Sequence, residues 1–123
     1  SGYKFTYQSE VVSTVQKCGK FLFDRGVTFS YDPPIASQEL LQLTDDTSTI
    51  VLDGATFHTT TTGIRIPQGI FEVRSKSFLS AEGGTEDVGI LFGDLAAGTA
   101  VDLRVRSAAQ LEVLQGCFQV EKE

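Results

Sequence analysis

The pattern of apolar and polar positions predicts short β-strands along most of the chain. Residues 3–7 (YKFTY) and residues 101–106 (VDLRVR) alternate apolar and polar side chains. A period of two places the apolar side chains on one face of a strand and the polar side chains on the other. Strands with one buried and one solvated face are typical of antiparallel sheets. We therefore expect antiparallel pairing.

Turn-forming residues separate these segments at short intervals. Examples are Asp-Pro-Pro at 32–34, Asp-Gly at 53–54, Pro-Gln-Gly at 67–69 and Gly-Gly at 83–84. Closely spaced turns between short segments rich in Val, Ile, Phe and Thr favour a β-sandwich or barrel over alternating strands and helices. The one helical candidate, residues 36–43, could equally be a strand. No internal repeat is visible.

The closing segment, residues 110–121, has apolar residues on both faces. They divide by parity into Leu111 and Val113 on one face and Leu114, Phe118 and Val120 on the other. Either this strand is central between two layers, or its outer face meets another subunit. Alternatively, a β-bulge at Gly116 switches the parity once and keeps all five residues in one core. The sequence leaves these alternatives open.

The opening strand is a natural neighbour of the last strand in an antiparallel sandwich. Its tyrosines combine an apolar ring with a hydroxyl group, which is a combination enriched at interfaces. If the two strands pair, Cys18 and Cys117 could approach disulfide distance; the alternative is two buried thiols. The predicted oligomer interface consists of Tyr3, Phe5, Tyr7, Leu114, Phe118 and Val120.

Composition restricts the class of protein further. The chain has 123 residues, of which 41% are hydrophobic and 21% charged, as expected for one globular domain. The net charge of −6 argues against binding to nucleic acid or an anionic membrane. No apolar run approaches the roughly 20 residues of a membrane-spanning helix. Residues 1–2 (Ser-Gly) have the form of a tag remnant, and we expect residues 3–123 to be the C-terminal tip of a longer protein.

Few side chains suit catalysis or metal binding. There is one histidine, His58, and we interpret it as a solvent-facing strand residue because it lies between Phe57 and a threonine tract. A zinc site needs about three or four ligands at close spacing, which this chain lacks. The acidic pairs at 45–46 and 86–87 would point to opposite faces of a strand, and such pairs are usually solvated turns or loose calcium ligands. We predict no enzyme activity, no metal and no cofactor.

Two segments carry a family resemblance. Residues 63–73 (GIRIPQGIFEV) resemble the strand, turn and G-I-Y/F-x-V/I segment in the jelly-roll domains of the tumour necrosis factor and complement globular-head superfamily. Residues 95–103 (LAAGTAVDL) are similar to its L-x-x-G-D/T-x-V-x-L hairpin, and residues 111–120 to its last strand. The nearest likeness is to the C-terminal domains of bacterial collagen-like surface glycoproteins. The resemblance implies an antiparallel jelly-roll-like sandwich of about 8–10 strands that forms a homotrimer.

These expectations lead to one functional hypothesis and one alternative. The hypothesis is a non-enzymatic trimeric fibre tip or adhesin head that recognises a glycan or protein receptor, located outside the cell or on a cell or virion surface, without nucleic-acid binding or membrane insertion. The alternative is a structural trimerisation or coat domain of a surface layer or stalk. Loops on a rigid sandwich would make the contacts. The candidate binding residues are Asp45, Asp46, Thr47, Glu82, Glu86, Asp87 and Ser107.

Overall fold

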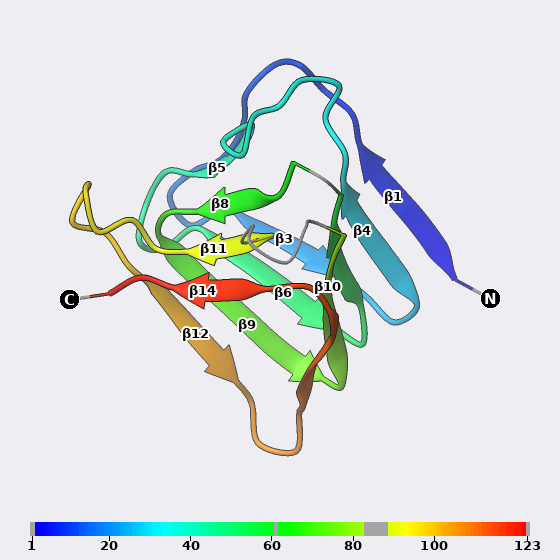
Figure 1. Ribbon diagram of the computed structural model, residues 1–123. Helices are drawn as coiled ribbons and strands as arrows, with labels where there is room; N and C mark the ends of the chain where they lie inside the picture. Colours follow the sequence, from blue (N-terminus) through cyan, green and yellow to red (C-terminus); the bar gives the residue numbers. More distant parts are fainter. Residues whose placement is uncertain (1, 61, 83–88, 123) are drawn as a thin grey trace.

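The chain is built from short strands. The computed structural model describes residues 2–60, 62–82 and 89–122, and within these ranges it contains fourteen strands and no helix (Figure 1). The strands are β1 (Tyr3–Tyr7), β2 (Ser13–Val15), β3 (Lys20–Phe23), β4 (Val27–Tyr31), β5 (Leu41–Leu43), β6 (Thr49–Asp53), β7 (Thr56–Thr59), β8 (Ile64–Ile66), β9 (Gly69–Ser75), β10 (Ser77–Ala81), β11 (Ile90–Phe92), β12 (Val101–Val105), β13 (Leu111–Gln115) and β14 (Phe118–Val120). The all-β prediction is confirmed.

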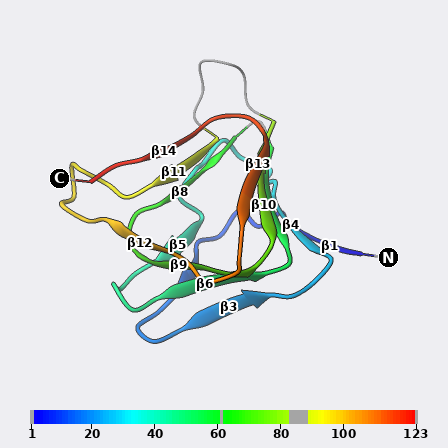
Figure 2. The ribbon, with the colours of Figure 1, turned by 90° about the horizontal axis from the view of Figure 1, so that it is seen from below.

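With the exception of β5, each strand from β1 to β11 pairs in parallel with the strand three positions further along the chain. The first face is the sheet β1-β4-β7-β10-β13, and the third face is the sheet β3-β6-β9-β12. The second face has two sections, β2-β5 and β8-β11-β14, which meet where β5 contacts β8. Three strands therefore make one turn of a coil, and successive turns stack around one interior, as in a parallel β-solenoid (Figure 2).

The antiparallel jelly-roll-like sandwich of about 8–10 strands is therefore wrong. Every pairing between the described strands is parallel, and the single antiparallel contact is an isolated bridge between Asp94 and Thr99. In most parallel sheets helices cover both faces, so alternation points to antiparallel pairing. In a coil each parallel sheet has one inward and one solvated face, which produces the same alternation. The helical candidate contains β5 instead.

The structure also shows a repeat that the sequence conceals. On the first face, Thr28 of β4 pairs with Thr56 of β7, and Thr56 pairs in turn with Phe78 of β10. Phe78 then pairs with Glu112 of β13, and more residues separate these two partners than separate the partners of either earlier pair. Turns of such unequal length leave no fixed period in the sequence.

Columns of stacked side chains fill the interior. Phe5, Phe29 and Phe57 occupy equivalent positions of β1, β4 and β7, and their ring centroids lie 5.7 and 5.2 Å apart along the column. A neighbouring column stacks Tyr7 on Tyr31 at 5.4 Å. Phe29, Phe57 and Tyr31 are buried in the single hydrophobic core. The alternation of the sequence thus becomes a set of inward rows, one above the other.

Glycines allow the chain to turn from the third face to the first. Gly26 and Gly54 both have positive φ values, 80° and 84°, in the left-handed region that glycine tolerates best. The backbone nitrogen of Tyr3 donates to the oxygen of Gly26, and the nitrogen of Gly26 donates to the oxygen of Gly54, both at 3.1 Å. The hydrogen-bonded ladder therefore continues around this corner.

The closing segment is two strands instead of one. β13 belongs to the first face and β14 to the second, and Gly116, with a φ of 86°, lies at the corner between them. The register of β13 against β10 shifts between Val113 and Gln115, so the parity changes at a β-bulge inside β13, before the corner at Gly116. The expected bulge is therefore present, but it precedes Gly116 and does not bury all five apolar residues. Leu114, Phe118 and Val120 are exposed.

The opening and closing strands lie at opposite ends of the coil. β1 pairs with β4 and β13 pairs with β10, so three strands of the first face separate β1 from β13. Cys18 follows β2 in the first turn, whereas Cys117 precedes β14 in the last turn, and no disulfide joins them. Both residues are exposed, so the alternative of two buried thiols is also wrong.

Substitutions within one inward column test the coil. Phe57→Ala removes a ring enclosed by the turns on both sides and is expected to lower the free energy of unfolding by about 3–5 kcal/mol. Phe5→Ala, at the open end of the same column, is expected to cost only about 1 kcal/mol. Denaturant titration of both variants measures the difference, and equal losses would contradict the stacking order.

Candidate functional site

A row of polar side chains crosses the outer surface of the first face. Phe29, Phe57 and Leu79 point inward from three adjacent strands. Because side chains alternate along a strand, the next residue of each strand points outward. These residues are in register with one another and with Gln115 of β13, in the order Ser30, His58, Ser80 and Gln115.

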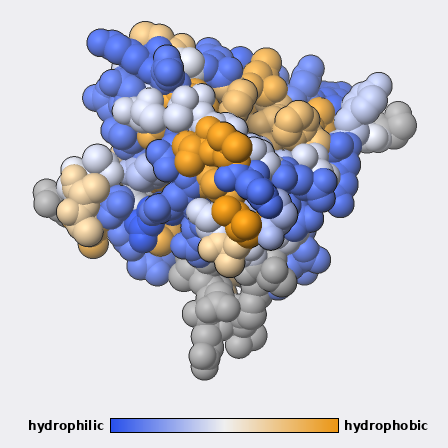
Figure 3. Space-filling view, turned by 90° about the horizontal axis from the view of Figure 1, so that it is seen from above, coloured by the Kyte–Doolittle hydropathy of each residue, from blue (hydrophilic) through white to orange (hydrophobic). Residues whose placement is uncertain are grey.

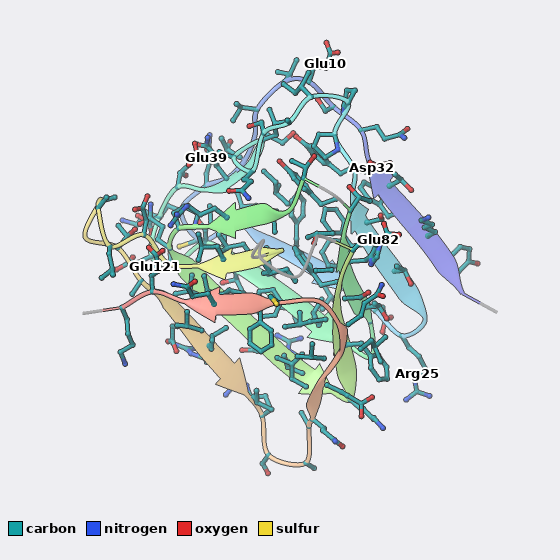
Figure 4. The ribbon with its side chains drawn as sticks, in the orientation of Figure 1. Glu10, Arg25, Asp32, Glu39, Glu82 and Glu121 are labelled. Carbon is teal, nitrogen blue, oxygen red and sulfur yellow. The ribbon has the colours of Figure 1, made fainter. Side chains whose placement is uncertain are left out.

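Both ring nitrogens of His58 are engaged in this row. Nδ1 lies 2.9 Å from the hydroxyl oxygen of Ser80, and Nε2 lies 3.2 Å from a carboxylate oxygen of Glu82. Figure 4 shows Glu82 beside the strands of the first face. The Nε2 of Gln115 donates to the same Ser80 oxygen at 3.1 Å. One tautomer satisfies every contact: the ring accepts at Nδ1 and donates at Nε2. The imidazole is therefore held in one orientation.

Ser80, His58 and Glu82 are the residue types of a catalytic triad, but the solvent exposure of the serine and of the acid differs from that in a triad. A nucleophilic serine must be open to substrate, and the acid that orients the histidine is normally buried. Here Ser80 is buried and its oxygen already accepts from Gln115, whereas the Glu82 side chain is 53% exposed. The His58 side chain is 17% exposed. The arrangement holds the imidazole of His58 in place but leaves no open serine hydroxyl group.

An open hollow of about 410 Å³ adjoins His58. It is lined by Gly2, Tyr3, Lys4, Gly26, Thr28 and His58, from β1, β4, β7 and their flanking residues. Tyr3 is 79% exposed and, two residues before the inward Phe5, borders the hollow from the edge of the first face. Lys4 and Thr28 add a cation and a hydroxyl group. The hollow thus combines an aromatic ring with donors and acceptors on the floor of a rigid sheet.

The predicted binding residues do not form one site. Asp45, Asp46 and Thr47 lie in the turn between β5 and β6, where the two aspartates border a separate open hollow of about 400 Å³. Ser107 lies in the turn between β12 and β13, and Glu82 follows β10, where it contacts His58. Glu86 and Asp87 lie outside the described residues. No group of three His, Cys, Asp or Glu side chains suited to a metal ion occurs in the ranges described.

The six predicted interface residues separate into three places. Tyr3 and Phe5 are exposed at the N-terminal end of the coil, while Leu114, Phe118 and Val120 are exposed at the C-terminal end. Tyr7 is buried, and its hydroxyl group donates to the backbone oxygen of Val11 at 3.0 Å. The view from above shows separate apolar patches among polar residues (Figure 3). The six residues therefore form no single surface.

Three carboxyl groups are held in the charged form by their surroundings. Hydrogen bonds from the side chain and backbone of Thr47 lower the pKa of Asp45. The pKa of Glu121 is lowered by the backbone nitrogen of Leu95 and then by Arg65. These groups are therefore fixed acceptors at neutral pH and unsuited to proton transfer there.

Glu72 is the buried member of this set. It lies on β9, where Arg74 hydrogen-bonds one carboxylate oxygen and Arg106, after β12, donates to the other at 2.8 Å. The hydrogen bond from Arg74 is the main cause that lowers the pKa of Glu72, and it outweighs the opposing effect of burial. The Arg106 contact joins two successive turns of the third face.

Comparisons with protein-family models, with curated proteins and with solved structures returned no match. In the part of the chain that the structure describes, no helix has the length and apolar character needed to cross a membrane.

The lowered pKa of Glu72 predicts an acid-sensitive contribution to stability. Since folding lowers this pKa, the contribution is fully present above the usual carboxyl range and is lost as the pH falls through the lowered pKa. Glu72→Gln is therefore expected to reduce the free energy of unfolding at neutral pH, and the difference from the parent should shrink as the pH falls. Denaturant titrations at several pH values measure it.

Glu112→Gln is the matched control, because Glu112 is exposed on β13. This variant should follow the parent across the whole pH range. A difference between Glu72→Gln and the parent that stays constant with pH would contradict the assignment.

Proposed function

We propose that the chain is a non-enzymatic recognition module that binds a neutral glycan on the outer surface of the first face. The observation that carries the proposal is the orientation of His58 by Ser80 and Glu82 at the edge of the Tyr3 hollow. A binding group that is already fixed loses little conformational entropy when a ligand arrives. The ordered row is therefore suited to reading the positions of sugar hydroxyl groups.

The chemistry of the hollow fits a carbohydrate. A sugar ring presents hydroxyl groups at its edge and C–H groups on its faces. Hydroxyl groups exchange hydrogen bonds with imidazole, ammonium and hydroxyl groups, which His58, Lys4 and Thr28 supply. The exposed Tyr3 ring offers an apolar surface to a sugar face.

The charge distribution favours a neutral ligand. Residues 26–100 carry three basic and ten acidic side chains, which gives this central part of the chain a net charge of −7. Long-range repulsion therefore acts against an anionic glycan. Lys4 is the one cation in the lining of the hollow, and it does not offset this charge.

The homotrimer and the location outside the cell or on a cell or virion surface stay predictions. The residues that suggested a trimer lie at both ends of the coil and in its core. The alternative function, a structural coat or stalk module, is favoured by a different observation, the apolar side chains left exposed at the two ends.

A glycan array probed with the labelled chain tests recognition, followed by calorimetric titration of the best ligand. His58→Ala and Tyr3→Ala should each weaken binding by about tenfold or more, since each removes a lining group of the hollow. Arg104→Ala, an exposed residue of β12 on the third face, should leave the affinity unchanged.

Two results would count against the proposal. If the chain bound no neutral glycan on the array, neutral glycans would be excluded as its ligands. Cleavage of a bound glycan or of a simple ester, abolished by Ser80→Ala, would instead show that the contacts of Ser80, His58 and Glu82 are catalytic.

A further inference from the structure

Two of the inward columns end in exposed side chains at both ends of the coil, and a third does so at the C-terminal end, whereas Tyr7 and Val15 of the first turn are buried. One column runs through Phe5, Phe29, Phe57, Leu79 and Val113. Its three inner members are 2%, 0% and 1% exposed, whereas Phe5 is 57% and Val113 is 38% exposed. The end members are as apolar as the inner ones, but each has a described turn on one side only.

Two columns of the other faces end in the same way. On the third face, Ile50 and Phe71 are buried between Phe21 and Leu103, which are both exposed. On the second face, Phe118 continues the column of the buried Ile64 and Ile90 and is exposed. Terminal repeats of soluble solenoid proteins normally carry a polar outer face. These end turns are instead apolar.

Strand edges accompany the apolar ends. The outermost strands are β1, β2 and β3 at the N-terminal end and β12, β13 and β14 at the C-terminal end, so each end presents one edge strand of each face. Such edges are templates for pairing with another chain. At the N-terminal end, a hollow of about 440 Å³ is lined mainly by apolar residues from all three faces, among them Phe5, Phe21 and Leu41.

The charges of the chain select the direction of contact. Residues 1–25, the first turn, carry four basic and two acidic side chains, for a net charge of +2. Residues 101–123 carry three basic and four acidic side chains, for a net charge of −1, and the middle carries −7. Contact between unlike ends is therefore attractive, whereas contact between flanks brings two strongly acidic surfaces together.

We propose that the N-terminal end of the coil docks onto the C-terminal end of a second copy of the same chain. Parallel sheets then continue from one copy into the next, and the exposed end members of the columns become inner members. Such a head-to-tail contact uses two different surfaces, so it leaves one of each free and grows as an open filament. This proposal does not depend on glycan binding. It names the surfaces through which a structural coat or stalk module would assemble.

Sedimentation velocity at increasing protein concentration tests the association. The parent chain should form species larger than a dimer. Phe5→Asp blocks the N-terminal end and Leu114→Asp blocks the C-terminal end, because each places a charge where the contact would exclude water. Both side chains are more than half exposed in the single chain, so the fold should persist, and thermal unfolding followed by circular dichroism checks this.

Mixing the two variants gives the decisive result. Each alone should stay monomeric, while an equal mixture should form a dimer and stop there, because one variant keeps a working C-terminal end and the other a working N-terminal end. Ile35→Asp, an exposed apolar residue between β4 and β5, should associate like the parent. His58→Ala should do so as well, which separates this result from glycan binding.

Three outcomes would overturn the proposal. The parent could remain a monomer at every concentration. It could form a closed dimer or trimer that does not grow. Finally, a single variant could still dimerise while the mixture forms no pair, which would indicate contact between like ends.

Discussion

Each turn of this coil depends on the turns beside it to keep its inward side chains dry. Phe57 is enclosed because Phe29 lies on one side of it and Leu79 on the other. No side chain of a turn could bury itself within that turn alone, since three short strands enclose too little volume. This constraint explains why Phe29, Phe57 and Leu79 are buried, while Phe5 and Val113, at the two ends of their column, are exposed. It also explains why the corners keep their backbone ladder at Gly26 and Gly54.

The same constraint fixes the positions of the outward residues. Packing fixes Phe57 and Leu79, and because the residues that follow them must point outward in register, His58 is placed beside Ser80. Hydrogen bonds then orient the imidazole, whose side chain is 17% exposed. The core beneath the polar row thus fixes the positions of the residues in the row. Because their side chains point away from the core, packing does not restrict which residue types occupy these positions.

Part of this could be predicted from the sequence. The alternation at residues 3–7 and 101–106 correctly placed two strands, because period two is a local property of the chain. The pairing partner is not local, and the turns that separate partners differ in length, so the repeat was hidden and the antiparallel interpretation failed. The position of His58 on a strand was predicted, although its side chain is only 17% exposed. Ser80 and Gln115 were not, because only the register of the coil brings them to it.

The direction in which copies associate determines whether the outer surface of the first face stays accessible. Association through flanks would cover the first face and oppose two acidic surfaces, so it would hide the His58 row. Association through the ends adds copies along the coil and leaves every outer surface open. A chain of such copies would present its His58 rows along one filament, and repeated weak sites on one body bind a polyvalent surface far more tightly than a single site does. Under the proposed association, the apolar ends thus determine which faces stay accessible.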